Sequence, residues 1–134
     1  NRRYNMQNLN GGVFDTVADK DYLDFFKDKE PRYDRIKDFL KFKKDDISKA
    51  IGIPLESVRF DERIPTEVQD LIIEWANVLN LVAGHFKGNP IKTALWFTTP
   101  NPLLGNIAPR DMVRLGRYKK LFKFILSSLS ENKR

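Results

Sequence analysis

The chain has 134 residues, a formal net charge of +6 and no cysteine. This length holds one domain or two very small ones, and the lack of cysteine excludes a disulfide framework and a thiolate metal site. No apolar run reaches the roughly 18 residues that a membrane span needs, so we expect no membrane association and a cytoplasmic protein.

The positive charge is concentrated at the end of the chain. Residues 1–109 carry 16 basic and 16 acidic side chains, whereas residues 110–134 carry 8 basic and 2 acidic ones. A basic terminal segment attracts nucleic-acid phosphates or an acidic protein surface. Charge alone therefore does not choose between DNA and protein as the partner.

The first third of the chain is predicted to be a polar arm followed by two helices. Residues 1–15 contain Asn10-Gly11-Gly12 and no apolar period, which indicates a flexible arm. Apolar residues at helical spacing then predict one helix over residues 16–29 and a second from Pro31 to Phe42.

Residues 44–60 have the spacing of a helix-turn-helix. A small residue, Ser48, precedes the turn residue Gly52, and Val58 follows at the position that anchors a second helix. The helix predicted from Leu55 to Phe60 is then the candidate recognition helix. The candidate DNA contacts are Lys44, Glu56, Ser57, Arg59 and Arg63. Because Asp61 and Glu62 dilute the local positive charge, a degenerate motif that only packs or dimerises is the alternative.

The longest predicted helix begins near Pro65 and runs to about Phe86. Thr66 and Gln69 have the spacing of a capping box. Apolar residues from Val68 to Phe86 recur at helical intervals for about five turns. We expect this helix to be the central element of one continuous helical body.

A proline-rich corner follows. Asn89-Pro90 predicts the start of a helix that ends at Trp96 to Thr99, where Pro100 and Pro102 make a stiff turn. Gly105 supplies a positive φ or a close backbone approach. Pro109 then begins a short helix that Gly116 closes.

The last predicted helix, from Arg117 to about Ser130, is amphipathic and basic. Tyr118, Leu121, Phe122 and Ile125 share one face. Such a helix covers its own core, lies on a membrane or inserts into a groove of a partner, and the membrane alternative has no second anchor.

The corner resembles the signature of the toxin-binding domain of Xre/MbcA/ParS-type antitoxins. That signature has a helix ending in Trp, a Pro-Asn-Pro segment, a Leu-Gly step and a proline-started helix. The matching residues are Trp96, Pro100, Asn101, Pro102, Leu104, Gly105 and Pro109. The chain departs from the family at Asn106, where a second Gly is usual, and at Arg110, where an aliphatic residue is usual. The interval before Gly116 is also shorter. The segment around Ser48 to Val58 is similar to the Xre-like helix-turn-helix of the same antitoxins.

The resemblance implies an all-α protein, with a helix-turn-helix part over residues 16–64 and a toxin-binding part over residues 65–134. It implies an antitoxin that occludes a RES-domain, NAD-consuming toxin and, as a homodimer, represses its own promoter. The candidate toxin contacts are the seven corner residues above together with Arg117, Lys120, Ser127, Ser130, Lys133 and Arg134. The rival function is a free-standing helix-turn-helix regulator that has no toxin partner.

An enzymatic function has little support in the sequence. The chain has one histidine, His85, and no glycine-rich phosphate loop, and its adjacent carboxylates diverge by about 100° on a helix. We therefore expect no catalytic residue, no metal site and no cofactor.

Overall fold

The computed structural model describes residues 20–132, with side chains described through residue 128. This part of the chain is mostly helical, which confirms the predicted helical fold class, but it also contains a small antiparallel hairpin. Its elements in chain order are β1 (Phe26–Lys27), β2 (Glu30–Pro31), α1 (Tyr33–Phe39), α2 (Lys44–Ile51), η3 (Leu55–Ser57), α3 (Thr66–His85), α4 (Pro90–Thr98), η4 (Pro102–Leu104), α5 (Pro109–Arg114) and α6 (Tyr118–Asn132).

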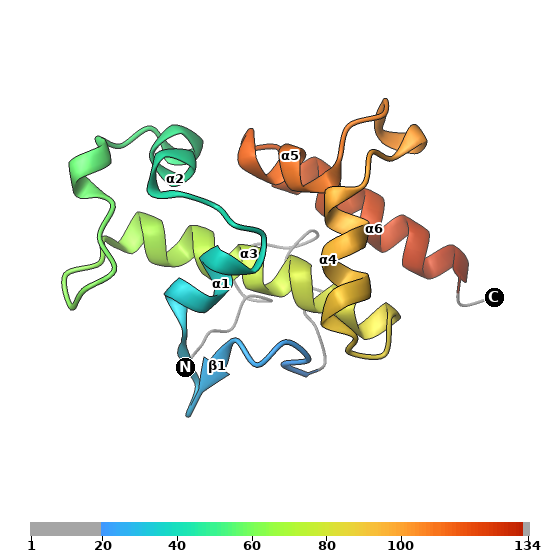
Figure 1. Ribbon diagram of the computed structural model, residues 1–134, viewed down its shortest axis with the longest axis horizontal. Helices are drawn as coiled ribbons and strands as arrows, with labels where there is room; N and C mark the ends of the chain where they lie inside the picture. The colour runs from blue at the N-terminus through green and yellow to red at the C-terminus, as the bar shows by residue number, and fades with distance from the viewer. Residues whose placement is uncertain (1–19, 133–134) are drawn as a thin grey trace.

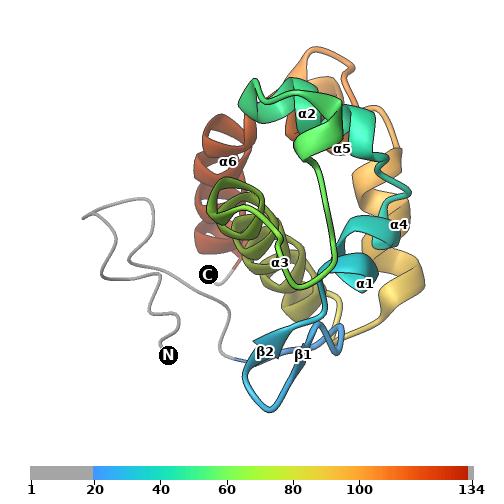
Figure 2. The same ribbon diagram turned by 90° about the vertical axis from the view of Figure 1, so that its left-hand side faces the viewer.

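Helix α3 is the central element, as predicted. It runs through the middle of the molecule with the other elements arranged around it (Figures 1 and 2). Its buried residues include the unbroken run from Trp75 to Asn80, so they lie on several sides of the helix rather than on one narrow stripe. A helix that is apolar around most of its circumference has to be covered by neighbours on more than one side.

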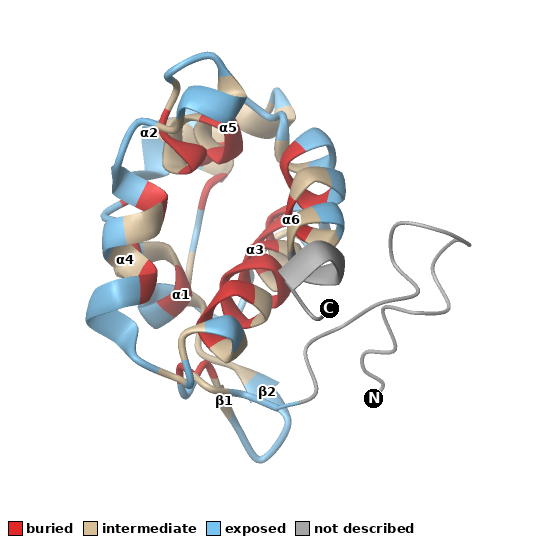
Figure 3. Cartoon of the chain, turned by 90° about the vertical axis from the view of Figure 1, so that its right-hand side faces the viewer, coloured by how far each residue is buried: buried red, intermediate tan, exposed pale blue. Residues whose placement is uncertain are grey.

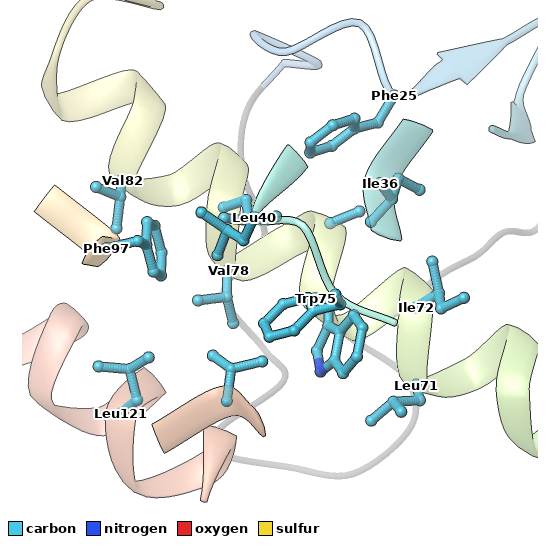
Figure 4. Packing of buried hydrophobic residues seen from close by; sticks show 14 of the residues in the cluster. Phe25, Ile36, Leu40, Leu71, Ile72, Trp75, Val78, Val82, Phe97 and Leu121 are labelled. Carbon is cyan, nitrogen blue, oxygen red and sulfur yellow. The ribbon is translucent and has the colours of Figure 1, made fainter. Parts of the chain in front are cut away.

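One hydrophobic core joins the two halves of the chain. Figure 4 shows Phe25, Ile36 and Leu40 from the N-terminal elements packed with α3, and Phe97 of α4 and Leu121 of α6 packed near Val78 and Val82. The cluster extends without interruption from Leu23 to Ile125. Burial therefore couples the stability of the N-terminal elements to that of the corner.

The helix predicted over residues 16–29 does not form in the part of this range that the structure describes, residues 20–29. From residue 20 the chain forms a turn and then the β1–β2 hairpin, in which Phe26 pairs with Pro31 and Lys27 with Glu30. Asp28 and Lys29 connect the strands with φ values of 52° and 71°, and two positive φ angles in succession are what a two-residue hairpin turn requires.

Local and long-range hydrogen bonds hold this non-helical segment in place. The carboxylate of Asp21 accepts bonds from the backbone N–H groups of Phe25 and Phe26, both at 2.8 Å. Buried Asn80 of α3 accepts a bond from the Leu23 N–H and donates one to Asp21, each at 3.0 Å. These side chains satisfy backbone groups that a helix would otherwise have paired.

Helix α1 is shorter than the predicted Pro31–Phe42 helix. Pro31 belongs to β2, and the helix ends at Phe39 because Leu40 leaves the helical region and Lys41 has a φ of 61°. Leu40 and Phe42 nevertheless remain buried.

The predicted recognition helix over residues 55–60 is also wrong. Helix α2 ends as expected at Gly52, with a φ of 71°, but the next segment is a single 3-10 turn, η3. Val58 is buried in extended conformation, and Asp61 turns the chain by accepting a bond from the Arg63 N–H at 2.9 Å. The helix stops after one turn because Val58 takes extended backbone angles, with φ −83° and ψ 101°.

The start of α3 differs in one detail from the prediction. Pro65 is the N-cap and Thr66 makes no capping-box bond. The Gln69 side chain instead donates to the carbonyl oxygen of Ile64 at 3.0 Å.

Candidate protein-binding surface at the proline corner

Helix α4 begins and ends as its sequence predicts. The Asn89 side chain accepts a bond from the Lys92 N–H at 2.9 Å, and Pro90 occupies the first turn. At the other end Thr99 is extended before Pro100, and its hydroxyl donates to the Leu95 carbonyl at 2.6 Å. The exit of the helix is therefore fixed by both proline and threonine.

The turn that follows is closed by Asn101. Its side chain accepts from the Leu103 N–H at 2.9 Å, its backbone N–H donates to the Ile107 carbonyl at 3.1 Å, and its carbonyl accepts from the Asn106 N–H at 2.9 Å. Gly105 and Asn106 both have positive φ, at 72° and 64°. Asparagine is the residue that best replaces glycine in this left-handed region, so the departure at Asn106 keeps the backbone path.

Arg110 anchors the corner to the N-terminal half of the chain. Its guanidinium donates to the carbonyl oxygens of Leu40 and Lys41 at 2.7 and 3.3 Å and lies 4.8 Å from the centre of the Phe42 ring. An aliphatic residue makes none of these bonds. The second departure from the family pattern therefore has a structural role that the sequence did not reveal.

The outer surface of the corner is apolar. Ile91, Leu95 and Leu103 have 79%, 63% and 79% of their surface exposed. The first two lie on α4 at an i, i+4 interval, and Leu103 lies on η4. Large exposed apolar side chains gathered on an ordered turn are typical of a protein-binding surface. None of the three was among the sequence candidates, because helical periodicity does not tell which apolar face is buried.

Beside them is an open hollow of about 390 Å³. Half-buried Trp96 and exposed Pro100 contribute to its wall. The full lining is Phe86, Lys92, Leu95, Trp96, Thr99, Pro100, Asn101 and Pro102.

The predicted toxin contacts differ in accessibility. Pro100, Pro102 and Gly105 are exposed, and Trp96, Asn101 and Leu104 are half-buried. Pro109 is buried at the start of α5, so its role is to position the helix rather than to touch a partner. Helix α5 contacts both α4 and α6 and so lies between the corner and the basic helix.

On α6 the expected apolar face is confirmed, with Leu121, Phe122 and Ile125 buried. The candidates Arg117, Lys120 and Ser127 are exposed. The side chains of Ser130, Lys133 and Arg134 lie outside the described part of the chain.

The predicted DNA contacts lie on α2, on η3 and in the loop after η3, and not on one recognition helix. Arg59 forms an ion pair with Asp61 at 2.7 Å, and the ammonium of Lys44 lies 6.0 Å from the centre of the Phe60 ring. The Arg63 N–H and the Arg59 guanidinium lower the pKa of Asp61, which keeps a negative charge beside these cations. Glu56 and Arg63 are exposed and Ser57 is half-buried, on one helical turn or the loop after it.

A second hollow, of about 500 Å³, is acidic. Glu67, Asp70 and Glu74 of α3 line it opposite Tyr118 and Lys119 of α6. Burial raises the pKa of Glu74, an effect opposed by a hydrogen bond from Tyr118 and by the charge of Lys119. Burial and then the charge of Glu67 raise the pKa of Asp70. Burial also raises the pKa of Tyr118.

Three further sequence features can be compared with the structure of residues 20–132: the histidine, a metal site and a membrane span. His85 is exposed at the end of α3, with its ring against Phe86. Within the same residues no three His, Asp or Glu side chains are grouped so that they can hold a metal ion. No helix in this range has the length and hydropathy of a membrane span.

The fold and the surface thus define a small helical domain with an ordered, apolar corner. In comparisons with known proteins, no family model, curated protein or solved structure matches the chain.

Proposed function

We propose that this protein is an antitoxin that binds and occludes a RES-type, NAD-consuming toxin. The observation that supports the proposal is the exposure of Ile91, Leu95 and Leu103 on a corner whose backbone is fixed by hydrogen bonds. An ordered surface loses little conformational entropy when it binds, so most of the apolar area that it buries contributes to affinity.

In this mechanism the chain performs no chemistry. The corner supplies the affinity, and the basic end of the chain, which includes Arg117 just before α6 and Lys120 on it, extends toward the active site of the toxin. Cations near that site compete with a substrate for negatively charged or hydrogen-bonding groups.

The proposal does not include DNA reading by residues 55–60, because that segment forms a single 3-10 turn. Promoter repression and a homodimer remain expectations from the sequence resemblance. A direct check is promoter retention by the Arg59→Ala variant, which we expect to equal that of the wild type because Arg59 already pairs with Asp61.

The antitoxin proposal is tested by co-expression with the product of the adjacent reading frame, followed by pull-down. We expect Leu95→Glu and Leu103→Glu each to reduce capture at least tenfold, because each places a charge in an apolar contact. Leu55→Glu is the matched control, since Leu55 is also an exposed leucine, at 48%, but lies on η3. Equal capture by all three variants would contradict the proposal.

A further inference from the structure

The hollow at the corner combines an apolar wall with a single cation. Lys92, Leu95 and Trp96 lie on α4 at i, i+3 and i+4, so they share a face of the helix, and this face lines the hollow together with Thr99, the extended residue that follows the helix. Phe86 adds a second aromatic group from beyond the end of α3. The volume of this open hollow, about 390 Å³, is near the lower end of the range for ligand-binding pockets, which leaves room for a large side chain.

The charge around this hollow has one sign. No aspartate or glutamate occurs between Lys87 and Arg110. Arg110 donates to the backbone carbonyls of Leu40 and Lys41 and forms an ion pair with Asp111. Lys92, in contrast, is exposed and takes part in no ion pair within residues 20–128. The ammonium of Lys92 is therefore available at the rim of an apolar site.

These features favour one kind of occupant. A second copy of the chain, related by a two-fold axis at this face, would bring Lys92 toward Lys92 across an apolar contact, which is unfavourable. A nucleic acid needs several cations along its backbone, and the hollow offers one.

We propose that the hollow receives a protein segment that inserts one large apolar side chain beside Trp96 and places a carboxylate against the Lys92 ammonium. This inference rests on the proposed function, in which the segment belongs to the toxin. It adds the chemistry of the contact, namely an aromatic or aliphatic anchor with an acidic neighbour.

The inference is testable without the toxin. The full chain, labelled with ¹⁵N, is titrated with N-acetyl-L-phenylalanine, which has the anchor and the carboxylate, and separately with its uncharged amide. We expect both to shift the signals of Leu95 and Trp96, including the Trp96 indole N–H, and the acid to bind about two- to fivefold more tightly, as an exposed ion pair allows. Lys92→Met should abolish this difference, and Lys123→Met, which changes an exposed lysine of α6, should preserve it.

Three results would overturn the inference. The first is that neither probe shifts the signals of the corner, and the second is that the wild type binds acid and amide equally. The third is that the same signals shift with protein concentration in the absence of probe, which would assign the face to a second copy. The proposed function fails separately, through unaltered toxin capture by Leu95→Glu. If the probes bind as expected while that variant still captures the toxin, the hollow serves a different acidic protein segment.

Discussion

At the scale of single residues, two backbone angles decide how the corner is made. Gly105 and Asn106 are consecutive left-handed residues, and the space around Gly105 is open, so the φ angle rather than crowding selects its residue type. We expect Asn106→Gly to change the free energy of unfolding by less than about 0.5 kcal/mol, and Asn106→Val to lower it by about 1–2 kcal/mol. Urea unfolding of the three proteins measures this. An Asn106→Val protein as stable as the wild type would show that this angle is not required.

Arg110 allows a second prediction at this scale. Arg110→Leu removes the guanidinium that donates a hydrogen bond to the Leu40 carbonyl. It also removes the contact of this group with the Phe42 ring. We expect a loss of about 1–3 kcal/mol in the free energy of unfolding. Arg117→Leu, at an exposed position after α5, is the control and should cost less than about 0.5 kcal/mol. Equal midpoints in urea for the two variants would argue against the anchoring role.

At the scale of elements, the contact between α3 and α6 contains a half-buried carboxyl group. Glu74 faces Tyr118 and Lys119 on α6, with Asp70 beside it on α3. Its pKa is raised in the folded protein above the ordinary value of 4.5, so the folded state holds a proton that the unfolded state has released. The contribution of Glu74 to stability is therefore fully present below pH 4.5 and is lost as the pH rises through the folded pKa.

Glu74→Gln tests this pH dependence. Glutamine still accepts a bond from Tyr118 but carries no charge, so the variant should gain stability relative to the wild type as the pH rises from about 4.5 to 7. Tyr118→Phe should cost about 1 kcal/mol at pH 7, because it leaves the half-buried carboxylate without its donor. Thermal unfolding across this pH range measures both effects. A difference between Glu74→Gln and wild type that does not vary with pH would contradict the assignment.

The elements also show which parts of the fold the sequence predicts. Helices α3 and α6 were predicted because apolar periodicity over several turns is a strong signal. The hairpin was not predicted because the apolar residues within 22–29 have helical spacing. Its turn also depends on positive φ angles at Asp28 and Lys29, which non-glycine residues seldom adopt. The bonds from Asn80 to Leu23 and Asp21 join residues almost sixty positions apart, and no local pattern contains them.

The candidate site was predicted only in part, for a related reason. Proline, asparagine and glycine marked the corner, and the structure forms its turn where they indicated. Ile91 and Leu95, however, fit a helical period equally well whether they point to the core or to solvent. Their exposure depends on where α3 and α5 pack against α4, which is a property of the tertiary structure.

At the scale of the whole molecule, one core connects the corner, the central helix and α6. Phe97 of α4 and Leu121 of α6 both pack close to the α3 residues Val78 and Val82 (Figure 4). Figure 3 shows the same arrangement, with buried segments of α3 and α6 facing each other and exposed segments outward. The corner is therefore held by the same core that holds the basic helix, and the two surfaces keep a fixed relation.

Under the proposed antitoxin function, this arrangement predicts that capture and neutralisation of the toxin are separable. Deleting residues 127–134 leaves Leu121, Phe122 and Ile125 in the core, so the midpoint of thermal unfolding should fall by only a few degrees. The corner is unchanged, so the truncated chain should still capture the toxin in a pull-down. Neutralisation should be lost, because the segment that reaches the active site is missing.

The matched comparison is Leu95→Glu in the full-length chain, which keeps that segment but alters the corner. It should lose capture and neutralisation together, since a basic segment without the apolar contact is a weak, salt-screened ligand. Both variants are measured by pull-down and by growth of cells that express the toxin. If the truncated chain protects the cells as well as the full-length chain does, occlusion is achieved by the corner itself and residues 127–134 have no part in it.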